Sequence, residues 1–230
     1  MCSPEMAIRE LDWALARGAR VVCMRPAPAW TANGPRSPAD ALFDPFWARL
    51  SEAGIALVVH AGDSGYSANG YAADGFGASF GGGGGGWKPS IKAFNIERAA
   101  HDFLITLVFE KLFDRFPNLR IASVENGSDY LGDLFKKLRQ TAKKTPGWFK
   151  EDPVETFRRH VWINPFWEDD VREISAHMGA ERVIFGSDWP HIEGMPAPLD
   201  YLTELDGFDA ASKRRILSEN VRELNTPRPA

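Results

Sequence analysis

Two short apolar runs in this chain each lead into a polar residue that could bind a metal. Residues 182–185 lead into a glycine, a serine and Asp188, and residues 55–59 lead directly into His60. A short continuous apolar run that ends in loop-forming residues is typical of a buried parallel strand. Parallel strands bring their carboxyl ends to one edge of a sheet, where α/β proteins hold ligands and metals. The sequence therefore predicts His60 and Asp188 at one edge, as two ligands for one divalent metal.

Helix and strand patterns alternate along the rest of the chain. The expected strands span residues 19–24, 55–59, 119–124, 161–164 and 182–185. The expected helices span residues 4–17, 38–53, 96–116, 128–140, 153–159, 169–178, 198–205 and 209–224. Strands that are joined through helices must pair in parallel. We therefore expect an α/β fold with five parallel strands, either part of a (β/α)8 barrel or an open doubly wound sheet, built as a single domain over residues 1–230.

One segment, residues 64–90, interrupts this alternation. Tyrosine, phenylalanine and tryptophan residues stand there among many glycines, six of them consecutive at 81–86. We interpret the segment as a Gly-rich loop insertion. Because it follows closely on His60, it could act as a lid over the site. The alternative is a surface insertion without a role.

Composition excludes several classes of protein. The chain has 230 residues and a net charge of −4, with no basic stripe, so we expect no nucleic-acid partner. No apolar run approaches the roughly 20 residues of a membrane span. The two cysteines, Cys2 and Cys23, form neither a disulfide framework nor a zinc-binding pair. We therefore expect a cytoplasmic protein with a packed core and a small-molecule substrate.

Together, the motifs at the expected strand ends resemble those of the amidohydrolase-related family. This is the branch of metal-dependent barrels that includes amino-carboxymuconate-semialdehyde decarboxylases and related hydrolases. The resemblance extends from about Gly18 to Asn220, and the motif that contains Asp188 is its most specific part. The motifs that carry it are His60-Ala61-Gly62, Glu125-Asn126-Gly127, Asn164-Pro165-Phe166-Trp167, Gly186-Ser187-Asp188-Trp189-Pro190-His191 and Ile216-Leu217-Ser218-Glu219-Asn220.

The resemblance implies a (β/α)8 TIM-type barrel that holds one divalent metal, with zinc the expected ion. His60 matches the family's fifth-strand ligand, and Asp188 matches the eighth-strand aspartate, which binds the metal or takes a proton from metal-bound water. The first-strand His-x-His pair of the family has no counterpart here, because no two of the five histidines stand two residues apart. We therefore predict a partial barrel, an N-terminally truncated copy that lacks the His-x-His strand.

A second departure concerns the expected sixth strand. Where the family often has a histidine, this chain has Glu125. Glu125 is a candidate for the site as a metal ligand, a base or a substrate contact. The alternative is a salt-bridged loop carboxylate.

Four further residues follow expected strand ends and are candidates for substrate binding. His191 lies three residues after Asp188, and Arg25 follows the first strand, where it could bind a carboxylate. Trp167 and Trp189 could wall an apolar pocket. Each also has an ordinary explanation as a loop residue packed or hydrogen-bonded locally.

The functional expectation is a metal-dependent hydrolase or a non-oxidative carboxy-lyase that acts on a small carboxylate- or ester-bearing molecule. Asp188 and Glu125 are its expected catalytic residues. A catalytic zinc normally takes three protein ligands, and only two are convincing here, so we expect this chain alone to bind metal weakly or not at all and to be impaired in activity. The alternative is a non-catalytic truncated barrel that associates through its open sheet edges. Its partner would be a second copy or a complementing N-terminal half.

Overall fold

A computed structural model describes residues 3–62, 92–191 and 194–228 of the chain. Its central feature is a sheet of four parallel strands in the order β1 (Val21–Met24), β4 (Ala56–His60), β5 (Arg120–Val124) and β6 (Val161–Asn164). The expected α/β fold with a parallel sheet and flanking helices is confirmed, and it is consistent with a partial barrel. The Gly-rich loop expected at residues 64–90 lies outside the described residues.

The segment expected as a fifth strand, residues 182–185, joins the sheet only through one parallel bridge between Ile163 and Val183. The amide of Ile184 donates to the carbonyl of Ile163 at 2.9 Å, but the next amide, that of Phe185, donates to Ile216 instead. The ladder therefore stops after one step, and the C-terminal helical segment takes the place of further pairing. The prediction of five full strands thus becomes four strands and a bridge.

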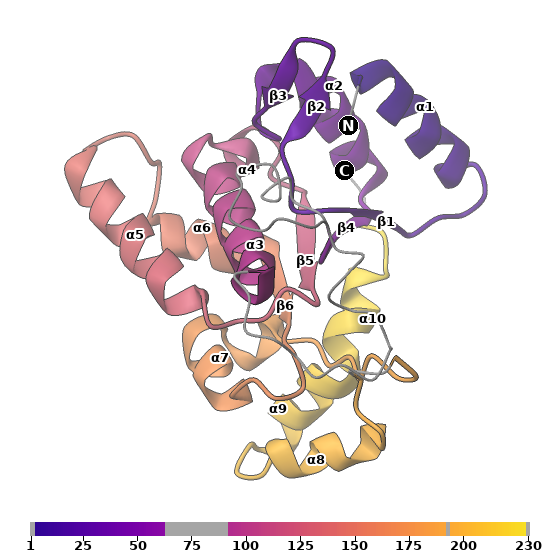
Figure 1. Ribbon diagram of the computed structural model, residues 1–230, viewed down its shortest axis with the longest axis vertical. Coiled ribbons are helices and arrows are strands. Elements are labelled where there is room, and N and C mark those ends of the chain that lie inside the picture. Colours follow the sequence, from indigo (N-terminus) through magenta and orange to yellow (C-terminus); the bar gives the residue numbers. More distant parts are fainter. Residues whose placement is uncertain (1–2, 63–91, 192–193, 229–230) are drawn as a thin grey trace.

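Helices and short turns connect the strands (Figure 1). The helices are α1 (Pro4–Leu15), α2 (Asp44–Ala53), α3 (Lys92–Phe109), α4 (Leu112–Arg115), α5 (Leu131–Lys144), α6 (Pro153–His160), α7 (Val171–Met178), α8 (Tyr201–Glu204), α9 (Ala210–Arg214) and α10 (Asn220–Leu224). The 3-10 turns are η1 (Ala41–Phe43), η4 (Ala180–Arg182) and η5 (Pro198–Asp200), and η6 (Arg215–Glu219) is a π-helical turn. None of the helices in the described ranges is both long and apolar enough to cross a membrane.

Two expected helices are interrupted, and one hairpin was not expected. The single helix expected over residues 96–116 is broken, because Lys111 adopts a left-handed φ of 57° and α4 begins after it. The helix expected over 209–224 contains the π-turn η6. The loop after β1 holds an antiparallel hairpin that the sequence did not predict, β2 (Ala29–Thr31) with β3 (Gly34–Arg36).

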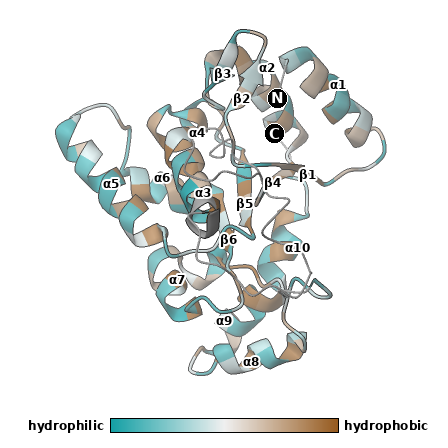
Figure 2. Cartoon of the chain, viewed as in Figure 1, coloured by the Kyte–Doolittle hydropathy of each residue, from teal (hydrophilic) through white to brown (hydrophobic). Residues whose placement is uncertain are grey.

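The sheet has two apolar faces, as expected for a barrel wall. Leu57, Val59, Ile121 and Ile163 point outward into the main core, which contains residues from α1 to α7. Helices α3, α5 and α6 lie on that side and α10 on the other (Figure 1). Helix α5 is amphipathic, which explains its position: its apolar residues face the core and its charged residues face solvent (Figure 2). A smaller apolar cluster on the inner face consists of Ala56, Ala122, Trp162, Ile184 and Leu224.

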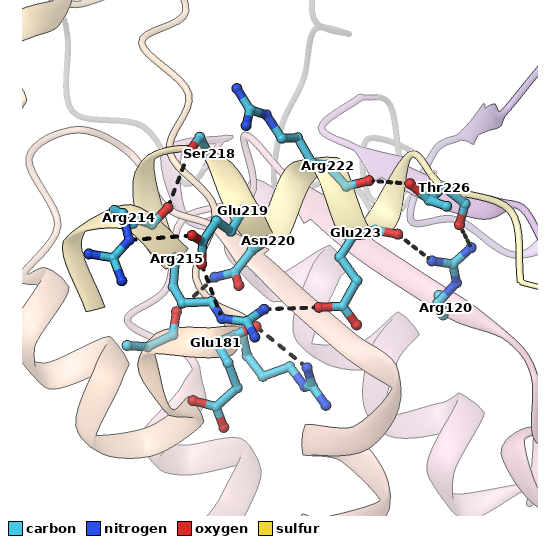
Figure 3. Close-up of polar contacts among 12 residues, drawn as sticks. Arg120, Glu181, Arg214, Arg215, Ser218, Glu219, Asn220, Arg222, Glu223 and Thr226 are labelled. Carbon is cyan, nitrogen blue, oxygen red and sulfur yellow. Dashed lines mark hydrogen bonds and ion pairs between the residues drawn. The ribbon is translucent and has the colours of Figure 1, made fainter. Parts of the chain in front are cut away.

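A buried arginine fastens the C-terminal segment to the amino-terminal edge of the sheet. Arg120 is only 1% exposed. Its guanidinium donates to the carbonyls of Glu223 at 2.8 Å and Thr226 at 2.9 Å (Figure 3), and also to Gly54. None of the predicted site residues lies at this amino-terminal edge. The contacts there stabilise the fold, and the candidate site residues lie at the opposite, carboxyl edge.

Candidate active site

The carboxyl edge of the sheet brings His60 and Glu125 into contact. His60 is the last residue of β4 and lies opposite Val124 in β5, so Glu125 follows directly beside it. His60 Nε2 lies 3.2 Å from Glu125 Oε2. The parallel register alone explains this approach, because neighbouring parallel strands end at the same height.

The imidazole of His60 has a defined orientation. Its Nδ1 lies 2.9 Å from the carbonyl oxygen of Ala61. A carbonyl can only accept, so Nδ1 carries a proton and donates it. In the neutral ring, the lone pair of Nε2 then faces the Glu125 carboxyl. A backbone carbonyl that fixes the Nδ1 proton and leaves Nε2 available is also the arrangement typical of metal-binding histidines.

Asp188 reaches the same place from the loop after the Val183 bridge. It lies close enough to Glu125 to raise the pKa of that carboxyl group, and its Oδ2 lies 3.3 Å from Nδ1 of His191. Backbone bonds shape this loop: His191 donates to Asp188, and Met195 donates to Ser187, both at 2.8 Å. His60, Glu125, Asp188 and His191 therefore form one connected polar group, which we call the edge cluster.

The surroundings of Glu125 disfavour its charged form. Burial, and then the hydrogen bond and negative charge of Asp188, raise the pKa of Glu125, while the positive charges of His60 and His191 oppose this rise. Glu125 therefore keeps its proton to a higher pH than an isolated glutamate does.

Both carboxyl residues have an uncommon backbone conformation. Glu125 and Asp188 each have a φ of 54°, in the left-handed region. Outside glycine this region is sparsely populated, and it is costly for a glutamate. Glu125 directly follows β5, and Asp188 lies in the loop after the Val183 bridge. Strain of this kind persists where the surrounding structure holds it, which is common in functional sites.

Arg25 approaches the site along the neighbouring strand. A Cβ on Gly62 would lie 2.6 Å from Cδ of Arg25, so the arginine passes across a glycine that directly follows the His60-Ala61 pair. The exposed guanidinium therefore belongs to the same edge. The two tryptophans are placed differently: Trp167 is half-buried, and Trp189 is 63% exposed. Trp189 therefore does not form an enclosed pocket wall in this structure.

Two residues that support the site were not singled out from the sequence. Asn126 is fully buried, and its Nδ2 donates to the carbonyl of Val59 at 2.8 Å, which ties the turn after β5 to β4. Glu97 from α3 accepts from the amide of Asp129 at 3.3 Å and packs against Gly127. The Asn-Gly pair after a strand was a signal for the first residue. No local pattern marked Glu97, whose partner is 32 residues away.

The donor set has the right chemistry for a metal but is incomplete. Imidazole nitrogen and carboxylate oxygen are ordinary ligands of zinc and manganese. In the part of the chain that the structure describes, however, no group of three or more histidine, cysteine, aspartate or glutamate side chains is arranged to hold a metal ion. Because a catalytic zinc takes about three protein ligands, these residues do not form a metal site by themselves.

The parallel sheet with polar residues at its carboxyl edge defines the class, an α/β protein with a candidate active site at that edge. Comparison with known families makes this specific: residues 3–224 match the amidohydrolase family model. The chain belongs to the amidohydrolase family and thus to a family of enzymes. No curated protein matches the chain significantly.

Solved structures agree with this assignment. An amidohydrolase from Mycobacterium avium subsp. paratuberculosis K-10 is 39% identical with a TM-score of 0.87, and the match covers 99% of this chain and 57% of that protein. A dihydroxybenzoic acid decarboxylase from Polaromonas sp. JS666, with bound manganese and an inhibitor, is 19% identical with a TM-score of 0.73, covering 97% of this chain and 66% of that one. A 5-carboxyvanillate decarboxylase from Sphingomonas paucimobilis is 20% identical with a TM-score of 0.67, covering 96% and 63%. This chain therefore spans less than two thirds of the length of its mycobacterial relative.

Proposed function

We propose that this chain carries one part of the active site of a metal-dependent amidohydrolase-family enzyme, which decarboxylates or hydrolyses a small carboxylate- or ester-bearing molecule. The observation that supports this proposal is the edge cluster, in which His60, Glu125, Asp188 and His191 meet at the carboxyl edge of a parallel sheet. His60 and Asp188 would be two ligands of one divalent metal. The other ligands would come from polypeptide outside the described residues.

Each residue of the edge cluster has a role that follows from its contacts. The metal, when bound, would polarise the substrate carbonyl or carboxylate. In its protonated form the Glu125 carboxyl could give a proton to a substrate carbon in a decarboxylation, and in its ionised form it could take a proton from water in a hydrolysis. His191, bonded to Asp188, can pass that proton to solvent.

Substrate binding involves the residues around the cluster. Arg25 reaches the same edge and has the planar donor geometry that binds a carboxylate. Trp167 and Trp189 stand at the neighbouring strand ends and would contact the apolar part of the substrate. These roles favour a flat, anionic small molecule over a polymer.

The structural neighbours favour the carboxy-lyase reaction within this proposal. Both distant neighbours are decarboxylases of substituted aromatic acids, and one of them holds manganese. Zinc remains our proposed metal for this chain from its histidine and aspartate ligands, and manganese is the ion to test beside it. We also propose a cytoplasmic enzyme without a nucleic-acid or membrane partner.

Metal binding tests the first half of the proposal. Equilibrium dialysis of the chain against Zn²⁺ or Mn²⁺, with metal analysis, should show weak binding by the wild type. Asp188→Asn should lower the affinity by roughly 10-fold or more, as losses around metal sites typically do. The control is Asp206→Asn at an exposed aspartate of the α8–α9 loop, which should bind as the wild type does. Equal affinity in both variants would refute the role of Asp188.

Turnover tests the second half. The metal-loaded protein is assayed for CO₂ release from 5-carboxyvanillate and dihydroxybenzoate, and for acid release from a phenyl ester. In a preparation that shows activity, Asp188→Ala should abolish turnover, because it removes a ligand and a proton carrier together. Retained turnover would reject the assignment.

A further inference from the structure

A hollow lies at the junction of α5 and α6, in the outer layer of helices. These two helices pack against each other (Figure 1), and the loop of residues 145–152 that joins them lines much of the hollow. Its volume is about 400 Å³, within the range of small-molecule sites. Helix α5 begins just after the turn that carries Glu125 and is 14 residues long, so its last turn lies about 20 Å from its start. The hollow is therefore separate from the edge cluster.

Two positively charged side chains line this hollow without a carboxylate partner. Arg139 and Lys143 stand four residues apart on α5, so they lie on the same face of the helix. Neither forms an ion pair with a carboxylate among residues 3–62, 92–191 and 194–228, and the guanidinium of Arg139 lies 6.0 Å from the ring centroid of Phe135. Like charges at this spacing destabilise a helix. A bound anion would offset their repulsion.

The end of the helix explains only one of these two charges. Lys143 stands in the last turn of α5, where a cation offsets the partial negative charge of the helix carboxyl end. Arg139 stands one turn earlier, where this effect has faded. The position of Arg139 therefore fits a ligand in the hollow better than it fits the helix dipole.

The two carboxylates that line the hollow already have partners. Glu151 accepts from both Nη1 and Nη2 of Arg159 at 2.7 Å, and this pairing lowers the pKa of Glu151. Asp152 is the N-cap of α6 and accepts from the amide of Val154 at 2.9 Å. Because both carboxylates are engaged by their neighbours, the charge left for a ligand is positive, which favours an anion.

The loop that lines the hollow is held in place by its own contacts. Trp148 donates from Nε1 to the carbonyl of Phe109 at 3.0 Å, and Nζ of Lys111 lies 3.9 Å from the centroid of the Trp148 ring. The next residue, Phe149, lies beside Phe109 with ring centroids 6.3 Å apart and also lines the hollow. A wall that is formed before the ligand arrives reduces the entropy lost on binding.

We propose that this hollow binds a small organic anion, a carboxylate with an apolar body. The carboxylate would accept hydrogen bonds from Arg139 and Lys143. The apolar body would lie against Ala142, Phe149 and Pro153, which line the same hollow. This site goes beyond the proposed reaction, and its test needs neither metal nor turnover, so either proposal can fail without the other.

The test is an NMR titration of the full, metal-free chain labelled with ¹⁵N. Benzoate is the probe, benzamide is its neutral analogue, and inorganic phosphate is an anion without an apolar body. Benzoate should shift the amide resonances of Gly147 and Phe149 saturably and bind at least roughly 10-fold more tightly than either comparison compound, because each lacks one of the two kinds of contact. Absence of these shifts, or equal affinity for benzamide or phosphate, would overturn the proposal.

Paired variants show whether the two cations of the hollow are responsible. The double variant Arg139→Gln with Lys143→Gln should bind benzoate roughly 10-fold more weakly or worse, because it removes charge-assisted hydrogen bonds. The control, Arg20→Gln with Arg222→Gln, removes the same charge at two positions outside the hollow and should bind as the wild type does. All four positions are exposed, and the spectra show that each variant is folded. Unchanged affinity in the first variant, or an equal loss in both, would overturn the proposal.

Discussion

At the scale of single residues, the site depends on backbone conformation as much as on side-chain chemistry. Glu125 and Asp188 both have a left-handed φ, and Asp188 contributes to the raised pKa of Glu125. A glutamate gains nothing locally from this conformation, so tertiary contacts must hold it. The turn after β5 is held by Asn126, which donates to the carbonyls of Val59 and Val124, and by Glu97, which accepts from the amide of Asp129.

This strain leads to a stability prediction. Glu125→Gly should be more stable than Glu125→Ala by about 1 kcal/mol, because glycine adopts a left-handed φ without the Cβ clash. Both variants lack the carboxylate, so their difference isolates the backbone. Urea denaturation gives the free energies of unfolding.

Lys111 offers a matched pair outside the site. Lys111 has a φ of 57°. The Lys111→Gly variant should therefore have a larger free energy of unfolding than the Lys111→Ala variant. If Glu125→Gly were no more stable than Glu125→Ala while the Lys111 pair behaved as expected, the conformation at Glu125 would not be strained.

At the scale of elements, the junctions between helices and strands rely on buried polar groups. His160 ends α6, is 4% exposed, and stacks on Phe113 with ring centroids 4.4 Å apart. Its Nδ1 lies 2.7 Å from the carbonyl of Leu119, to which it donates. This bond ties α6 to the chain that enters β5, which lies next to β6 in the sheet.

His160 should make stability depend on pH. Burial lowers its pKa, with the Leu119 carbonyl opposing this effect. Below about pH 6.5 the unfolded chain binds a proton that the folded protein excludes. Stability present above that pH is therefore lost as the pH falls toward the folded pKa, by at most about 1.4 kcal/mol per pH unit.

The variant His160→Asn removes this titration and can keep a donor to Leu119. Its free energy of unfolding should be lower than that of the wild type at pH 7.5, since the stack on Phe113 is lost. It should fall less steeply between pH 6.5 and 5.5, as measured by urea denaturation. An unchanged slope would show that another group causes the pH dependence.

At the scale of the whole molecule, the C-terminal segment closes the amino-terminal edge of the sheet. Arg120 donates to carbonyls of Gly54, Glu223 and Thr226, and burial lowers its pKa. Asn220 donates to the carbonyls of Ala180 and Val183, which fastens α10 to the bridge segment. Loss of these bonds would release the element that covers Trp162.

Arg120→Met should therefore destabilise the protein by about 3 kcal/mol, because it leaves buried carbonyls without donors. The control is Arg222→Met, the same substitution at an exposed position on α10 (Figure 3), which should change stability by less than about 0.5 kcal/mol. Thermal denaturation of both variants provides the comparison. Similar melting temperatures for the two would contradict the role given to Arg120.

Much of the fold was predictable from local pattern. The apolar runs at 55–59, 119–124 and 161–164 became β4, β5 and β6, because continuous apolar runs between helices specify buried parallel strands. The run at 182–185 has the same pattern but forms one bridge, because the amide of Phe185 bonds Ile216 from far along the chain. A competing partner at such sequence separation leaves no local signal.

The sequence by itself determined the alternation of strands and helices, and which polar residues stand at strand ends, since both depend on residue spacing. Only the tertiary structure decided that Glu125 lies beside His60, that Glu97 supports the turn after β5, and that Arg120 fastens the C-terminal segment to the sheet. These depend on strand order and on contacts between distant segments, which no single stretch of sequence encodes.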